Sequence, residues 1–281
     1  MNAMTKITAA APVSHAVETS LGRLHVVETG AGPQTIVLWP SIFTDHRIYD
    51  GIVARLGGSF RFLLIDGPGH GRSGGGGTEF TMEACGEAMA EVMDHFGLDS
   101  AHVGGTSWGG IAAAHLALAA PERARTLVLM NTPMEIDAAR PGLPARLIAG
   151  GARWMPGWRV FRNGVAASFF SREVLAADPA QASAFHSMLK SADPSRLATA
   201  VRSVILRGTP LKDRMSGLTV PTLVIAGRED GMYPLAVQAE AALLAPRGRF
   251  EPVGGKHVSV VERPDEVAAI LRDFLAGEAP R

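Results

Sequence analysis

Short apolar runs alternate with helix-like stretches along most of this chain, and this alternation is the feature that most restricts its fold. Several of the runs are continuously apolar, as expected of strands that are covered on both faces. Strands and helices in alternation predict an α/β domain with a doubly wound, mostly parallel sheet. The expected strands are 23–29, 35–39, 60–66, 101–105, 126–131, 222–227 and 249–253, and the expected helices are 81–98, 108–120, 234–245 and 263–277.

The first two strands are joined closely enough to be antiparallel neighbours, so we expect a mixed sheet. The alternation breaks once, between residues 134 and 217, where helical patterns, prolines and bulky apolar residues dominate without a convincing strand. This break predicts a core made of residues 1–133 and 218–281 and an inserted helical cap at 134–217. We expect the cap to lie over the carboxyl edge of the sheet.

The balance of charges excludes some partners. The 281 residues carry 27 basic and 27 acidic side chains, so the formal net charge is zero. Such a chain has no overall field that draws it to nucleic acid or to an anionic membrane, and we expect neither as a partner. No apolar run reaches the length of a membrane span, and the first residues lack the apolar segment of a signal peptide. With a single cysteine, Cys85, and therefore no internal disulfide, the chain is expected to be cytoplasmic.

One serine lies between two pairs of glycines, where an apolar run ends and an alanine-rich stretch begins. The segment GGTSWGG places Gly105 two residues before Ser107 and Gly109 two residues after it, followed by Gly110. A turn this tight between a strand and a helix strains the serine backbone, and only small neighbours permit it. The turn lifts the hydroxyl above the strand end and places the Trp108 amide at a helix N-terminus, where an oxyanion is stabilised. The pattern predicts a nucleophile at Ser107.

A serine hydroxyl needs a base to take its proton, and the base needs a third group to orient it. Asp230 and Glu229 follow the expected strand 222–227, and His257 follows the strand 249–253. Nucleophile, acid and base in this order along the chain are typical of a serine triad on a parallel α/β sheet. We predict His257 as the base and Asp230 as the orienting acid, with Glu229 as the alternative acid.

Four motifs together resemble the α/β-hydrolase superfamily over nearly the whole chain. Besides GTSWGG, the segment LLIDGPGHGRS at 63–73 resembles the family's D-x-P-G-H-G-x-S turn. GREDGMYP resembles its acid loop, and GGKHVSVVERPDEV resembles its histidine loop. The resemblance implies an α/β-hydrolase fold with a helical cap, Ser107 as nucleophile, His257 as general base and then acid, and Asp230 as the acid that orients it.

The loop after strand 35–39 departs from the family pattern. In the segment LWPSIFTDHRIYD, Pro40 and Ser41 stand where the family carries His-Gly. A proline has no N–H group, so Pro40 cannot donate a hydrogen bond. Ile42 is the expected second amide donor of the oxyanion hole beside Trp108, and Ser41 is the alternative.

Bulky apolar side chains of the insertion are expected to line the substrate pocket as well as to form the core of the cap. Such a wall favours a small, uncharged, hydrophobic ester or lactone as the substrate. The residues predicted to bind it are Trp154, Trp158, Phe161, Phe169 and Met188.

These residues together predict a serine hydrolase that cleaves a carboxylic ester or a lactone through an acyl-enzyme intermediate. Hydrolysis of a C–C bond and formation of a peracid are alternatives on the same scaffold, and a ligand-binding protein without turnover is a third. All three triad residues are present, which speaks against the third. The histidines show no metal-ligand spacing with acids or cysteines, so neither a metal nor an organic cofactor is expected.

Overall fold

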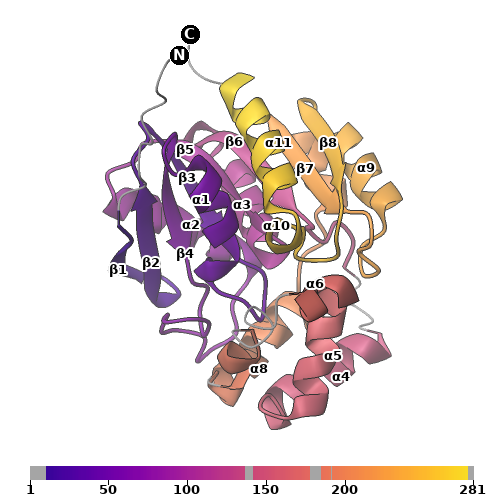
Figure 1. Cartoon of the computed structure of the whole chain (residues 1–281). Helices are drawn as coiled ribbons and strands as arrows, with labels where there is room; N and C mark the ends of the chain where they lie inside the picture. Colours follow the sequence, from indigo (N-terminus) through magenta and orange to yellow (C-terminus); the bar gives the residue numbers. More distant parts are fainter. Residues whose placement is uncertain (1–10, 137–141, 178–184, 191, 278–281) are drawn as a thin grey trace.

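An eight-stranded sheet forms the centre of the molecule (Figure 1). The computed structural model describes residues 11–136, 142–177, 185–190 and 192–277. The strands lie side by side in the order β1-β2-β4-β3-β5-β6-β7-β8. Their bounds are β1 Val13–Thr19, β2 Gly22–Gly30, β3 Gln34–Trp39, β4 Phe60–Ile65, β5 Ala101–Thr106, β6 Ala124–Met130, β7 Thr222–Gly227 and β8 Gly248–Val253.

All neighbouring strands from β4 to β8 pair in parallel, whereas β2 pairs antiparallel with both β1 and β4. The sheet is therefore mixed and mostly parallel, as predicted. The prediction that the first two expected strands are neighbours is wrong, because β3 lies between β4 and β5. Five of the six residues of β3 are buried, and a strand so apolar is stable only inside the sheet.

Helices cover both faces of the sheet. The chain crosses from β3 to β4 in one direction and from β4 to β5 in the other. Right-handed crossovers therefore place α1 and α2 on opposite faces. Helix α11 packs against α1 on one face, and α3 packs against α2 on the other. The helical elements of the core are η1 His46–Tyr49, α1 Asp50–Leu56, α2 Met82–His95, α3 Trp108–Ala119, η2 Pro121–Arg123, α9 Leu235–Leu244, α10 Ser259–Glu262 and α11 Pro264–Gly277.

Between β6 and β7, every element that the described residues form is helical. These helices gather below the sheet in Figure 1. They contact the loop after β8, where the Val258 amide donates to the Phe169 carbonyl and the Ser171 amide donates to the Glu262 carboxylate. The insertion thus lies at the carboxyl edge of the sheet. Its elements are α4 Leu143–Trp154, α5 Arg159–Phe169, α6 Arg172–Ala177, the helical residues 185–190, α8 Pro194–Val201, η3 Arg202–Leu206 and η4 Lys212–Gly217.

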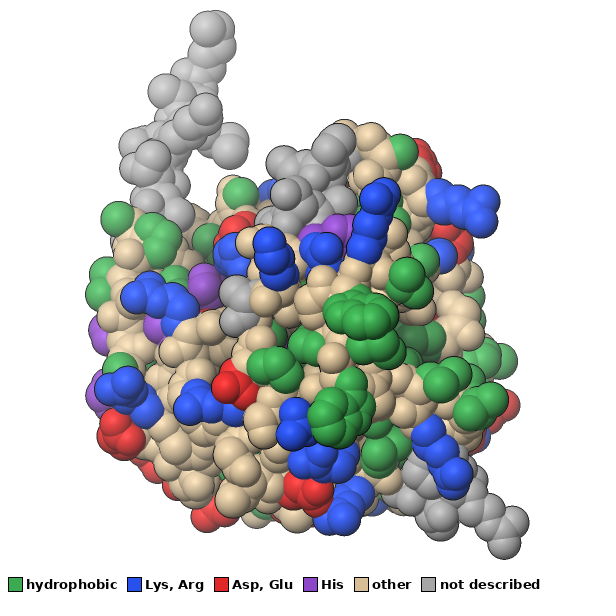
Figure 2. Space-filling view, turned by 90° about the horizontal axis from the view of Figure 1, so that it is seen from below, with side chains coloured by type: hydrophobic (Ala, Val, Ile, Leu, Met, Phe, Trp, Pro, Cys, Tyr) green, Lys and Arg blue, Asp and Glu red, His purple; other side chains and the backbone are tan. Residues whose placement is uncertain are grey.

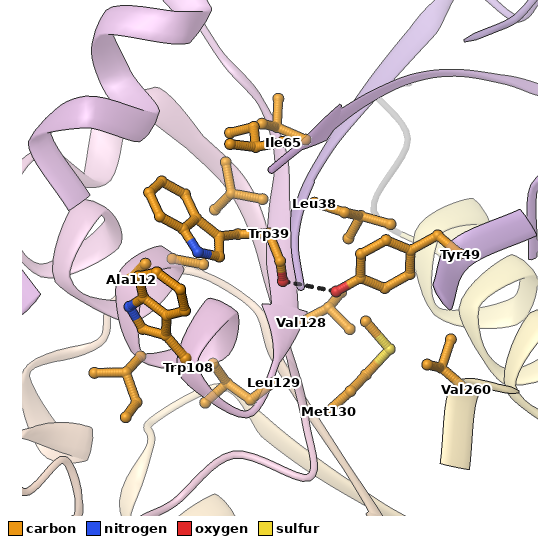
Figure 3. Packing of buried hydrophobic residues seen from close by; sticks show 14 of the residues in the cluster. Leu38, Trp39, Tyr49, Ile65, Trp108, Ala112, Val128, Leu129, Met130 and Val260 are labelled. Carbon is orange, nitrogen blue, oxygen red and sulfur yellow. Dashed lines mark hydrogen bonds between the residues drawn. The ribbon is translucent and has the colours of Figure 1, made fainter. Parts of the chain in front are cut away.

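One buried apolar cluster runs from the sheet into the covering helices (Figure 3). Trp39 at the end of β3 and Trp108 at the start of α3 are fully buried, with ring centroids 5.3 Å apart in an edge-on arrangement. The two rings fill the space directly beneath the carboxyl edge of the sheet. In the part of the chain that the structure describes, we find no helix with the length and apolarity needed to cross a bilayer.

Candidate active site

Ser107 occupies a strained turn between β5 and α3. Its backbone has φ 56° and ψ −114°, a conformation that residues with a Cβ rarely adopt. The Ser107 amide donates to the Met130 carbonyl of the neighbouring strand at 2.8 Å. Its carbonyl accepts from Gly110 and Ile111 at the start of the helix. Bonds on both sides hold the turn, so the surrounding structure imposes the strain.

The glycines around Ser107 are required by close backbone contacts. A Cβ on Gly109 would overlap the Trp39 carbonyl group, and a Cβ on Gly105 would collide with the Gly109 backbone. A Cβ on Gly110 would overlap the Thr132 hydroxyl. The sequence predicted this close approach, and the structure identifies the groups that demand it.

His257 and Asp230 form a buried pair at the neighbouring strand ends. His257 Nδ1 lies 2.9 Å from Asp230 Oδ2, and the two side chains are 2% and 1% exposed. The Met232 amide also donates a hydrogen bond to Oδ1 of Asp230. Burial by itself would raise the pKa of Asp230, but the hydrogen bonds from His257 and its neighbours lower it below the usual value. The carboxylate therefore stays charged and holds the imidazole by its Nδ1 side. Glu229 is exposed to solvent, so the structure brings Asp230, not Glu229, to the histidine.

Asn131 holds this pair from the end of β6, and sequence reasoning missed it. It follows β6, the strand between those that lead to Ser107 and Asp230. Its side-chain amide donates to Asp230 Oδ2 at 3.2 Å and to the Lys256 carbonyl at 3.1 Å. The Ser259 hydroxyl donates to Asn131 Oδ1. A polar residue directly after a buried strand was the available signal.

Ser107 and His257 follow strands that end at the same edge of the sheet. Among the described residues, however, the Ser107 hydroxyl makes no hydrogen bond to the His257 imidazole. Hydrogen bonds between catalytic groups are often long without substrate and shorten when substrate binds. The structure thus brings Asp230 and His257 into contact and places Ser107 at the same edge of the sheet.

Backbone amides near Ser107 are free to bind an anion. The Trp108 amide lies in the first turn of α3, where the helix offers no acceptor. In the loop after β3, the Phe43 amide donates to His70 Nε2 at 3.1 Å, and the Thr44 amide donates to the Ser41 carbonyl. Among the described residues, no acceptor is recorded for the amides of Ser41 and Ile42. These are the two donors that the sequence pattern predicted.

His70 fixes the conformation of this loop. Its Nδ1 lies 3.1 Å from the Pro68 carbonyl, which can only accept, so Nδ1 carries the proton and Nε2 accepts from Phe43. Burial lowers the pKa of His70 and favours this neutral ring. Phe43 itself has φ 63°, a left-handed conformation that the bond from His70 helps to hold.

A second polar cluster anchors the same loop from the other side. Asp66 accepts from the Nδ1 atoms of His25 and His46, each at 2.8 Å, and from the amides of His46 and Arg72. Burial would raise the pKa of Asp66, but the bonds from both histidines lower it well below its usual range. In the described part of the chain, these three side chains lie close enough together to offer a metal three ligands. Their facing atoms already bond to one another, so we interpret the cluster as structural.

The cap residues predicted to bind substrate fall into two groups. The Phe169 ring lies 5.1 Å from the His257 ring, and Phe161 packs edge-on against Phe43 at 6.1 Å. The Trp154 and Trp158 side chains are 75% and 63% exposed. For these two we correct the expectation of a pocket-lining role, because Trp154 lies on the solvent-facing side of α4 and Trp158, directly before α5, is exposed as well.

A cavity of about 380 Å³ lies between the cap and the core, beside the loop that carries Ile42. Thr44 of that loop lines it, as does Met188, the fifth predicted substrate-binding residue. Arg47 also lines the cavity, but the neighbouring Asp45 binds its guanidinium at 2.6 Å. The other lining residues are Asp45, Ile48, Asp50, Gly51, Phe170, Phe185, Val261 and Pro264. The cavity is therefore mainly apolar, and its arginine is already paired.

Residues 34–264 match the family model described as alpha/beta hydrolase fold. The chain belongs to this family. The α/β-hydrolase is 27% identical over 256 residues to a pimeloyl-[acyl-carrier protein] methyl ester esterase of Edwardsiella ictaluri, in a match that covers 89% of this chain and 96% of the relative. It is also 27% identical to a 2-hydroxy-6-oxononadienedioate/2-hydroxy-6-oxononatrienedioate hydrolase of Paraburkholderia phymatum. That match covers 90% of this chain and 91% of the relative. The crystal structure of the enol-lactonase from Burkholderia xenovorans LB400 matches with a TM-score of 0.85 and 26% identity, over 94% of this chain and all of that one. The predicted fold and family are confirmed.

Tyr49 joins the two strand ends that carry the candidate site of this α/β-hydrolase. Its hydroxyl donates to the Trp39 carbonyl at 2.7 Å (Figure 3). The same hydroxyl accepts from the Thr106 amide at 3.0 Å. Trp39 precedes the loop with Ile42, and Thr106 precedes Ser107. The phenol is fully buried, which raises its pKa well above the usual value. Sequence reasoning missed this role, because it depends on a contact between distant segments.

We expect Tyr49→Phe to lower the free energy of unfolding by about 1–3 kcal/mol, since it leaves a buried carbonyl and a buried amide without this partner. Urea denaturation of the variant and the wild type measures the difference. Tyr233→Phe is the matched control, because the Tyr233 hydroxyl makes no hydrogen bond recorded among the described residues. Equal loss in both variants would contradict the role of the Tyr49 hydroxyl.

Proposed function

We propose that this α/β-hydrolase cleaves a carboxylic ester or a lactone with Ser107 as the nucleophile. The buried pair of His257 and Asp230, at the strand edge where Ser107 is held in a strained turn, is the observation that carries the proposal. An oriented imidazole next to a strand-end hydroxyl suits acyl transfer. A protein that only binds its ligand has no need of this pair or of the strain.

In the proposed reaction, His257 Nε2 takes the proton from Ser107 as its oxygen attacks the carbonyl carbon, and the carbonyl π electrons move to the oxygen. The resulting tetrahedral intermediate collapses, the C–O bond to the alcohol breaks, and the imidazolium gives its proton to the leaving oxygen. Water, deprotonated by the same histidine, then attacks the acyl-enzyme and frees the acid and Ser107. With a lactone, alcohol and acid remain on one molecule.

We assign the oxyanion hole to the amides of Trp108 and Ile42, with Ser41 as the alternative second donor. The Phe43 and Thr44 amides are engaged in hydrogen bonds, whereas the Ser41 and Ile42 amides have no acceptor among the described residues. The Ser41 hydroxyl is buried and has no hydrogen-bond partner among the described residues. A buried hydroxyl in this state destabilises the fold unless a bound group uses it.

Ser41→Ala tests whether the hydroxyl contributes to the oxyanion hole. If it does, kcat should fall by about tenfold to a hundredfold, because one donor to the developing charge is lost. The free energy of unfolding should stay equal or rise by up to about 1 kcal/mol, since no bond in the free enzyme is removed. An unchanged kcat would leave the backbone amides as the sole donors from this loop.

The cap at 134–217 is proposed to cover the substrate, and the cavity between cap and core is proposed to hold its apolar part. Met188 lines this cavity, whereas Ser107 and His257 do not. The substrate would therefore extend from the cavity past Phe169, which lies against His257, and Phe161, which lies against Phe43, to reach Ser107. Because Arg47 is paired with Asp45, the described lining of this cavity offers no unpaired cationic side chain that could bind an anionic substrate. We therefore propose a small, uncharged, hydrophobic ester or lactone.

Hydrolysis of a C–C bond is the second candidate, and similarity to the 2-hydroxy-6-oxononadienedioate hydrolase supports it. Short p-nitrophenyl esters, γ-lactones and 2-hydroxy-6-oxononadienedioate, assayed side by side, separate the two. We expect kcat/KM for the best ester or lactone to exceed that for the dianion by about 100-fold or more, because the dianion would leave charges buried without partners. A higher kcat/KM for the dianion would establish the second candidate.

A further inference from the structure

The cap carries a cluster of large apolar side chains that face solvent. Leu143, Leu147, Trp154, Met155, Trp158 and Val160 form this apolar patch, and all but Met155 are at least 63% exposed. In the described residues, the remaining strongly exposed large apolar side chains are Val13, Leu243 and Leu244. A contiguous exposed apolar patch on a folded protein marks a surface that binds something apolar.

Helical spacing places three members of the patch on one face of α4. Leu143, Leu147 and Trp154 lie four and seven residues apart, which places them on the same side of the helix. The opposite side carries the buried Ala152, and α4 packs against the rest of the cap, mainly α8. Both the packed face and the solvent face of this helix therefore carry apolar side chains.

Positive charge surrounds the patch. Residues 142–172 contain five arginines, namely Arg146, Arg153, Arg159, Arg162 and Arg172, and no acidic residue. The Arg153 guanidinium stacks over the Trp154 ring at 4.7 Å from its centroid. Arg146, Arg153 and Arg159 form no ion pair with any other described residue. Seen from the cap side, hydrophobic side chains gather in a group that Lys and Arg side chains border (Figure 2).

We propose that this face of the cap docks onto the surface of an anionic phospholipid membrane. Tryptophan favours the boundary between headgroups and acyl chains, and leucine favours the region just below it. The arginines would meet the lipid phosphates, and their stems would stay against the apolar layer. The zero net charge of the chain led us to expect no membrane partner, but it averages over this local excess of positive charge.

A second copy of the chain is a weaker candidate for the same surface. In a twofold symmetric contact, the patch of one copy would face the patch of the other, and the arginines would lie against each other. That contact would bury like charges together, whereas an anionic lipid surface neutralises them. The charge pattern therefore favours lipid.

Tryptophan fluorescence reports on this face selectively. Of the four tryptophans, Trp39 and Trp108 are fully buried, whereas Trp154 and Trp158 lie in the patch. Vesicles of phosphatidylcholine with phosphatidylglycerol should shift the emission to shorter wavelengths and should sediment with the protein. Vesicles of phosphatidylcholine alone should bind at least about tenfold more weakly, and added salt should weaken binding to the anionic vesicles.

Two sets of variants assign the binding to the patch. Arg146→Glu combined with Arg153→Glu should lower partitioning by about 20-fold or more, and Trp154→Ala combined with Trp158→Ala by about tenfold or more. The matched controls are Arg125→Glu and Leu243→Ala, which change exposed residues on β6 and α9 and should leave partitioning unchanged. Thermal unfolding of each variant verifies that it folds.

Three outcomes would overturn the proposal. The first is no binding to anionic vesicles at any ionic strength. The second is binding that the patch variants do not weaken, which would place the contact on another face. The third is a dimer in light scattering that the tryptophan variants convert to a monomer, without vesicle binding, which would make the patch a contact between copies of this chain.

Discussion

Replacing Ser107 by alanine is expected to lower kcat for ester hydrolysis by at least about 10⁴-fold, because no other group in the proposed mechanism attacks the carbonyl carbon. The fold should be unaffected, since alanine keeps the Cβ and the Ser107 side chain makes no recorded hydrogen bond in the described structure. Steady-state assays with p-nitrophenyl butyrate measure the loss. The control is Ser168→Ala, an exposed serine on α5, which should retain full activity.

The strained backbone of Ser107 predicts a difference in stability between two substitutions at this position. With φ 56°, Ser107 is in a region that glycine enters without strain. Ser107→Gly should therefore raise the free energy of unfolding by about 1 kcal/mol relative to Ser107→Ala, while both variants remain inactive. Activity that persists in either variant would contradict the assignment of the nucleophile. Equal stability of the two would contradict the strain.

Asp230→Asn is expected to lower kcat by about 10³- to 10⁴-fold, because the substitution removes the charge that orients His257 and stabilises its protonated form. Asp230 accepts from His257, Asn131 and Met232. An amide at this position can no longer accept on both sides, so it favours the wrong histidine tautomer or breaks one of these bonds. The same assays measure the effect.

The neighbouring acid provides the matched control. Glu229→Gln changes an exposed side chain one residue away and should keep kcat within about twofold. Loss of activity in Glu229→Gln with retention in Asp230→Asn would transfer the role of the acid to Glu229.

The pH dependence of stability gives a further check on Asp230. Folding lowers the pKa of Asp230 from 3.8. Its charged carboxylate therefore stabilises the fold above pH 3.8, and this contribution is lost as the pH falls through the pKa of the folded state. The stability of Asp230→Asn should therefore fall less in acid than that of the wild type.

Sequence patterns predicted most of the fold because its strands are apolar runs of ordinary length. Strand β1 was not predicted, and the second error concerned β2 and β3, which are separated by a few residues and were expected to pair. The continuous apolar run of β3 was the better guide, since a strand buried on both faces belongs inside the sheet, between β4 and β5. Closeness along the chain was given too much weight.

The candidate site was predictable to the extent that each residue follows a strand. Ser107, Asp230 and His257 all satisfy this rule, and their meeting at one edge follows from parallel topology. Asn131 also follows a strand and was overlooked, whereas Tyr49 could not be found in this way, because its importance lies in which distant carbonyl and amide it contacts. Trp154 was misjudged for a related reason: the pattern of a helix with apolar residues on more than one side does not tell which side faces the core.

The most direct test of the proposed site is covalent labelling with a fluorophosphonate, followed by digestion and mass spectrometry of the labelled peptide. We expect one label per chain, attached to the Ser107 oxygen, with labelling slowed strongly in the His257→Ala variant. Stable labelling of a different serine, together with loss of esterase activity at the rate of that labelling, would contradict the assignment.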